Sequence, residues 1–200
     1  MSIRATQKAE TRDRILTAAK NLFEAEGFES TNIRRIAEAS GVATGTVLFH
    51  FPDKADLLHT ALFEDLEGVL RSVTAAPPGR SLARWLAKVV DQVLAHYEAR
   101  PELSRVLLRE SLITGPPWAE RFAGQMSRLH AAVAARAVVA VERGELRRDF
   151  QPALFAMAFL SYYLFGLIAW AQASHPNPRA LVEHLVDHHL AGHRRTGPRT

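Results

Sequence analysis

Residues 33–52 read IRRIAEASGVATGTVLFHFP, with a small residue, a glycine and an aliphatic residue at fixed intervals. Ala37 is small enough for two helices to cross closely, Gly41 follows four positions later at a tight turn, and Val47 comes six positions after that as a buried anchor. Ile36 and Val42 supply apolar packing on either side of the turn. This spacing predicts a helix-turn-helix and favours DNA binding over an ordinary helical hairpin.

The rest of the chain is also predicted to be helical, because apolar residues recur with a helical period and alternating β-type runs are absent. The expected helices cover residues 8–26, 31–40, 44–49, 54–73, 81–100, 101–113, 118–143, 152–173 and 178–191. We therefore predict an all-α fold of about nine helices, in which a three-helix DNA-binding head is joined through the fourth helix to a C-terminal helical ligand-binding and dimerisation bundle. The expected divisions are residues 1–53, residues 54–193 and a flexible tail at 194–200.

Composition excludes several classes of protein. The 200 residues are 48% hydrophobic and 23% charged, which is typical of a globular protein. The absence of cysteine excludes disulfides, cysteine–zinc sites and thiol catalysis. The charged N-terminus has no apolar segment typical of a secretory signal, so we expect a cytoplasmic protein. None of the common nucleotide-binding, hydrolase or metalloprotease motifs is present, so we expect no enzyme and no cofactor.

Overall charge does not argue for nucleic-acid binding. The net charge is +4, but residues 1–60 contain eight basic and eight acidic residues. Residues 1–20 alone hold five basic and two acidic residues, which is a weak positive arm. DNA binding must therefore depend on local geometry.

Residues 31–54, TNIRRIAEASGVATGTVLFHFPDK, resemble the signature of TetR-type transcriptional regulators. Residues 15–28 resemble the first helix of that family, and residues 144–149 resemble its sequence before the eighth helix. The specific part of the resemblance covers about residues 10–60; beyond it, the number and length of helices are similar. The resemblance implies a homodimer that binds a partly palindromic operator in double-stranded DNA, with residues 44–49 of each copy in a major groove.

The resemblance also implies roles for individual residues. It implies that Thr31, Thr46 and Lys54 contact DNA phosphates, with help from backbone amides at the helix starts. It also implies that five residues lie at or near the major groove, namely Arg34, Thr44, Gly45, Phe49 and His50.

This chain departs from the family pattern at two positions. Leu48 stands where the family usually has tyrosine, and Thr44 where it often has lysine. We therefore expect few bidentate base contacts, with contacts to thymine methyl groups and DNA shape giving more of the specificity. Three structural alternatives stay open: Arg34 on a solvated face, Lys54 as a surface lysine, and His50 packing on the first helix.

The bundle is implied to hold a small hydrophobic or aromatic effector that releases the repressor from its operator. Two polar anchors and five apolar or aromatic residues are the candidates for its site: Arg105, Phe122, Met126, His130, Phe159, Tyr162 and Tyr163. The alternative for each aromatic residue is an ordinary place in the core.

Residues 153–171 contain no charged residue, and three interpretations of the protein stay open. We favour a helix buried on two sides, which forms a four-helix dimer interface with the ninth helix and has no membrane role. A membrane-anchored helical protein is the second, since the length suffices to cross a bilayer. A helical small-molecule-binding protein or enzyme with an accidental helix-turn-helix spacing is the third.

Histidines near the C-terminus have metal-ligand spacing on a helix. The pairs are His184 with His188 and His189 with His193. Asp187 is the only nearby carboxylate on that turn, and no cysteine or well-placed third ligand accompanies them. We favour a polar interface edge or a solvated face and expect no metal.

Overall fold

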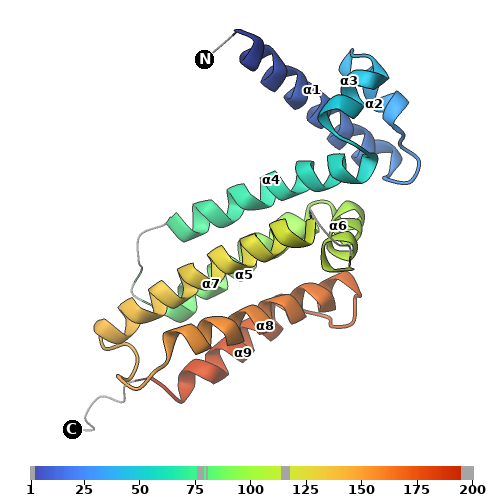
Figure 1. Ribbon diagram of the computed structural model, residues 1–200. Coiled ribbons are helices and arrows are strands. Elements are labelled where there is room, and N and C mark those ends of the chain that lie inside the picture. Colours follow the sequence, from blue (N-terminus) through green and yellow to red (C-terminus); the bar gives the residue numbers. More distant parts are fainter. Residues whose placement is uncertain (1–2, 76–78, 80, 114–117, 195–200) are drawn as a thin grey trace, which may run out of the picture. The chain divides into compact units, whose positions relative to one another are not determined.

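The computed structural model describes residues 3–75, 79, 81–113 and 118–194, and within them nine helices (Figure 1). The helices are α1 (Ile3–Glu26), α2 (Ile33–Ser40), α3 (Thr44–His50), α4 (Lys54–Ala75), α5 (Leu82–Glu98), α6 (Pro101–Ile113), α7 (Trp118–Glu142), α8 (Pro152–Ala171) and α9 (Pro178–Ala191). Extended pairing among these residues is limited to one isolated bridge between Leu146 and Arg194. The predicted all-α fold is confirmed. The expected tail lies almost entirely outside the described residues.

Local sequence sets the helix ends. Gly27 and Gly41 adopt φ angles of 84° and 68°, the left-handed conformation that glycine tolerates best, and they end α1 and α2. Helix α2 begins at Ile33 and not at Thr31 as expected, because the side chain of Asn32 caps it by accepting a hydrogen bond from the backbone N–H of Arg35 at 3.0 Å.

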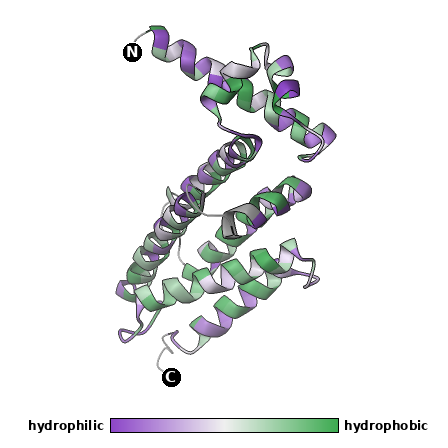
Figure 2. Ribbon diagram, turned by 45° about the vertical axis from the view of Figure 1, so that its right-hand side comes forward, coloured by the Kyte–Doolittle hydropathy of each residue, from purple (hydrophilic) through white to green (hydrophobic). Residues whose placement is uncertain are grey.

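Helix α1 is the one helix whose predicted start is wrong by more than two residues. It begins at Ile3 instead of Lys8, and every residue from Ile3 to Glu10 is exposed. This segment contains alanine, arginine, glutamine, lysine and glutamate, which favour helix without needing a buried face. Its colouring in Figure 2 is mostly hydrophilic.

The chain forms two compact units. The first comprises Met1–Leu66 and Arg100–Thr114, and the second comprises Glu67–Ala99 and Gly115–Thr200. Helix α4 contributes its first part to one unit and its remainder to the other. The functional division at residues 53 and 54 stays a prediction.

The first unit packs α1, α2 and α3 around a common core. Buried side chains from each helix supply it, among them Ile15, Ala19, Phe23, Ile36, Val47 and Phe51. Two ion pairs join α1 to α4 within this unit, between Lys20 and Asp65 at 2.8 Å and between Arg12 and Glu64 at 2.6 Å. The short α3 is therefore held in place by a packed scaffold.

The second unit packs α8 against α7 and α9, and α9 against α5. Its buried residues include Val89, Val93, Leu129, Val133, Phe155, Phe159 and Leu167. Helix α8 is long and apolar enough to cross a membrane, yet one of its sides packs inside this unit. Figure 2 shows hydrophobic colour along most of α8.

The anchoring of α3 gives a first prediction about stability. Val47 is fully buried, whereas its neighbour Leu48 is 47% exposed. We expect Val47→Ala to lower the free energy of unfolding by about 2 kcal/mol, because it loses buried methyl groups and leaves a small cavity. The control Leu48→Ala should change it by less than about 0.5 kcal/mol. Urea denaturation followed by circular dichroism measures both, and equal losses would contradict this account of α3.

Candidate nucleic-acid interface

The corner between α2 and α3 has the geometry that its sequence predicts. Ala37 is 3% exposed, so its small side chain lies where the helices cross. The Gly41 N–H donates to the Glu38 carbonyl at 3.3 Å, and the Val42 N–H donates to the Ala37 carbonyl at 3.1 Å. Val47 anchors the second helix in the core. The corner therefore fixes the direction of α3.

The exposed residues of α3 are mostly small or apolar. Thr44 and Gly45 are exposed, Thr46 is half-buried, and Phe49 is 72% exposed. With Leu48, which is 47% exposed, Phe49 places two large apolar side chains on the surface of this short helix. Within the first unit, the segment that the family resemblance implies for the major groove is thus exposed to solvent.

Helix α2 contributes two arginines that are paired on the surface. Arg34, whose side chain is 83% exposed, forms an ion pair with Glu38 at 3.1 Å. Arg35 pairs with Glu26 at 2.5 Å, and this hydrogen bond, followed by the charge of Glu26, raises the pKa of Arg35. Exposed pairs of this kind are weak, so a phosphate group can replace the carboxylate.

The side chains of Thr31 and Lys54 both donate hydrogen bonds to backbone carbonyls of the segment that follows α1. Thr31 is 1% exposed, and its hydroxyl donates to the Gly27 carbonyl at 2.8 Å. The Lys54 ammonium donates to the carbonyls of Phe28 and Glu29 at 2.7 and 3.3 Å. Thr31 therefore offers no hydroxyl to a phosphate, whereas Lys54 keeps a third N–H for another acceptor.

The sequence interpretation missed Lys8 as a neighbour of α3. The Lys8 ammonium lies 5.2 Å from the centre of the Phe49 ring, which places a cation beside the most exposed residue of that helix. The basic excess of residues 1–20 was the available signal. That signal does not show which helix this segment lies beside, because the contact joins two helices that are far apart in the sequence.

His50 lies half-buried at the end of α3. Burial lowers its pKa most, and the nearby charges of Lys8 and Arg12 lower it further. Arg12 itself lies 5.5 Å from the ring centre of Phe51. These effects favour the neutral imidazole, whereas an anion bound nearby would favour its protonation.

The expected effector residues fall in several environments. Phe159 is fully buried and stacks on Tyr163 with ring centres 6.3 Å apart, and Met126 is 9% exposed. Phe122 is half-buried, and Arg105 lies on α6 in the first unit, paired with Glu102 at 2.6 Å. Core packing thus accounts for Phe159 without a ligand.

The polar groups of this set differ in their partners. The Tyr162 hydroxyl lies 2.9 Å from Nδ1 of His189, and Nε2 of His130 lies 3.2 Å from the Ala153 carbonyl. The Tyr163 hydroxyl is buried and has no hydrogen-bond partner among the described residues, and this burial raises its pKa. Tyr163 is therefore the member of the set with an unmet polar group.

The C-terminal histidines lie along α9 and just after it. His184 and His188 are exposed, and His189 faces Tyr162. Among the described residues, no group of three histidine or carboxylate side chains is placed to hold a metal ion.

The known proteins that are similar to this chain are bacterial transcriptional regulators. Residues 15–61 match the profile described as "Bacterial regulatory proteins, tetR family". The repressor KstR of Rhodococcus jostii is 29% identical over 161 residues, which cover 80% of this chain and 73% of KstR. The repressor AcnR of Corynebacterium glutamicum is 29% identical over 171 residues, which cover 84% of this chain and 86% of AcnR.

A solved structure shares the fold over nearly the whole chain. FadR of Thermus thermophilus, a TetR family repressor solved with lauroyl-CoA, has a TM-score of 0.70 and 24% identity, and the match covers 94% of this chain and 98% of FadR. The relatives are named as transcriptional repressors, in agreement with the expectation of a regulator and not an enzyme. On this evidence and the geometry of α2 and α3, residues 15–61 are similar to the TetR family of bacterial transcriptional regulators, and nearly the whole chain shares the fold of a solved member of that family.

Proposed function

We propose that this regulator is a cytoplasmic repressor that binds, as a homodimer, a partly palindromic operator through α3 of each copy. The observation that carries the proposal is the exposed surface of α3 on a buried anchor, with Phe49 72% exposed and Val47 fully buried. Two such helices about 34 Å apart would enter successive major grooves on one face of a duplex.

The proposed contact surface differs slightly from the one expected from sequence. It keeps Arg34, Thr44, Gly45, Thr46, Phe49, His50 and Lys54, adds Lys8, and omits the buried Thr31. The α3 surface carries few long hydrogen-bond donors. Contacts of Phe49 and the threonine methyl groups with thymine, together with DNA shape, therefore supply most of the proposed specificity.

Helix α8 supports the proposed dimer. Its large exposed apolar residues are Leu154, Met157, Phe165 and Ile168, with exposed fractions of 61%, 61%, 55% and 38%. At about 100° per residue these four positions share one side of the helix. A second copy of the same face would cover this apolar stripe, and α9 would complete a four-helix interface.

The proposed effector response depends on α4, because this helix continues from Lys54 without a break into the second unit. A hydrophobic or aromatic molecule bound in the bundle would favour an arrangement of α4 that does not fit the operator. It releases DNA only if it binds that arrangement more tightly than the DNA-competent one.

The proposal is tested by binding to DNA from upstream of the regulator's own gene. We expect Phe49→Ala to weaken binding about tenfold, through loss of an exposed apolar contact. Lys8→Gln should weaken binding less, and should reduce the dependence of log affinity on log salt by about one counterion per protomer. Fluorescence anisotropy across a salt series measures both effects. Lys88→Gln, at an exposed position of α5, is the matched control and should change neither. Unchanged binding in Phe49→Ala and Lys8→Gln would contradict the proposed surface.

The lowered pKa of His50 gives a pH prediction with two opposite signs. DNA phosphates favour the protonated imidazole, so operator affinity should rise as pH falls through and below the ordinary histidine value of 6.5. In the DNA-free protein the unfolded state takes up this proton first, so stability should fall over the same range. Affinity and thermal denaturation measured from pH 8 to pH 5.5 give both trends, and His50→Gln should flatten the first. If operator affinity depends on pH in the same way in the unaltered protein and in His50→Gln, the assignment is contradicted.

A further inference from the structure

A cavity of about 270 Å³ lies between α4 and α7, inside the second unit. Charged and polar side chains line part of it, namely Glu67, Arg71, Gln125 and Arg128. Leu70 and Leu129 give it an apolar wall. None of the effector residues expected from the sequence lines this cavity. Its size is close to the lower end of the range for small-molecule pockets, about 300–1,000 Å³.

Gln125 gives this cavity an unmet acceptor. The residue is 1% exposed, and its Nε2 donates to Oε1 of Glu67 at 3.1 Å. Only the NH₂ group of the amide can donate to a carboxylate, so this bond fixes the orientation of the side chain. The amide Oε1 is buried and has no hydrogen-bond partner among the described residues. A ligand hydroxyl or N–H would satisfy it.

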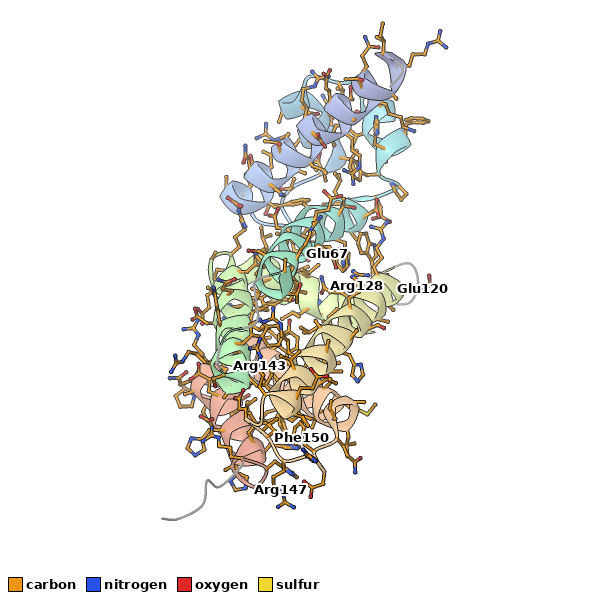
Figure 3. The ribbon with its side chains drawn as sticks, turned by 90° about the vertical axis from the view of Figure 1, so that its left-hand side faces the viewer. Glu67, Glu120, Arg128, Arg143, Arg147 and Phe150 are labelled. Carbon is orange, nitrogen blue, oxygen red and sulfur yellow. The ribbon has the colours of Figure 1, made fainter. Side chains whose placement is uncertain are left out.

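The charges around the cavity favour an anion. Arg128 donates to the same carboxylate oxygen of Glu67 that Gln125 uses, and Figure 3 labels Arg128 on α7 and Glu67 on α4 close to each other. Arg71 lines the same space, and in the part of the chain that the structure describes no carboxylate pairs with it. The lining of the cavity therefore carries one carboxylate and two guanidinium groups. Arginine is well suited to bind a ligand carboxylate.

We propose that this cavity binds an amphipathic carboxylic acid that also carries a hydroxyl group near its acid end. The carboxylate accepts hydrogen bonds from Arg71 and Arg128, the hydroxyl donates to Oε1 of Gln125, and the hydrocarbon part packs on the two leucines. The role of this acid as the effector rests on the proposed repressor function, whereas its binding does not.

Isothermal titration of the full chain with four C10 probes tests the binding: 3-hydroxydecanoate, decanoate, decan-1-ol and decylamine. We expect both acids to bind at least tenfold more tightly than the alcohol and the amine, and the hydroxyl to add about threefold. Equal or tighter binding of the alcohol or the amine, or no binding of either acid, would overturn the proposal.

Two variants assign the two contacts. Arg71→Gln, at an exposed position, should reduce acid affinity to the level of the alcohol. Gln125→Leu should remove only the advantage of the hydroxyl. Arg84→Gln, at an exposed position of α5 that lines a different cavity, is the matched control and should bind as the unaltered protein does. Full acid affinity in Arg71→Gln would overturn the proposed site.

The same titrations separate this inference from the proposed function. Operator binding without acid binding would overturn the acid site and leave the repressor intact. Acid binding that depends on Arg71, in a protein that binds no operator, would support the site and overturn the repressor. Release of operator DNA by 3-hydroxydecanoate, lost in Arg71→Gln, would support both.

Discussion

Replacing Phe165 with glutamate should convert the dimer to a monomer and lower operator affinity at least a hundredfold. Phe165 is 55% exposed in the single chain and lies on the same side of α8 as Met157. In a two-fold interface the substitution appears twice, so two carboxylates would lose water without a partner. A buried, unpaired charge costs several kcal/mol, enough to separate a dimer at nanomolar concentration.

Analytical ultracentrifugation and fluorescence anisotropy at nanomolar protein measure the two consequences. Circular dichroism should show unchanged helix content, because the position is exposed in the protomer. Val138→Glu is the matched control, since Val138 is a 43% exposed apolar residue on α7 and should leave the dimer intact. A dimer that persists in Phe165→Glu would contradict the proposed interface.

The second large effect is expected at Gly166, where α8 packs directly against α9. A Cβ atom added to Gly166 would overlap Cγ2 of Val182, and valine is stiff about χ1 in a helix. We expect Gly166→Ala to lower the free energy of unfolding by about 1–3 kcal/mol, because the clash outweighs the better helix propensity of alanine. Chemical denaturation measures the loss.

A double substitution identifies the cause of that loss. Val182 is 1% exposed, so Val182→Ala alone should destabilise the protein by about 2 kcal/mol through a cavity. In Gly166→Ala with Val182→Ala the new methyl group has room, so the two losses should not add. Strict additivity would contradict the close approach as the source of the effect.

The helix-turn-helix was predictable because its determinants are local. Ala37, Gly41 and Val47 lie within eleven residues, and their spacing fixes the corner without help from distant parts of the chain. The cap of α2 was not predictable in the same way. Thr31 and Asn32 are both good capping residues, and burial of the Thr31 hydroxyl against the Gly27 carbonyl leaves Asn32 to cap.

Other features depend on contacts that a single segment does not contain. The start of α1 at Ile3 has no capping signal, so the position of Lys8 beside Phe49 could not be inferred. The hydrogen bond between Gln125 and Glu67 joins residues 58 positions apart. Helix α8 is apolar on all sides, so its sequence indicates burial without showing which face packs inside the protomer.

Selection of bound duplexes from a random DNA library tests the central claim most directly. A dimer that presents α3 from both copies should enrich one partly palindromic site, with half-site centres about 10 base pairs or a multiple of that apart. The exposed surface of α3 should determine the half-site, so Phe49→Ala should change or weaken it. A selection that enriches no sequence, or a site that has no two-fold symmetry, would contradict the account.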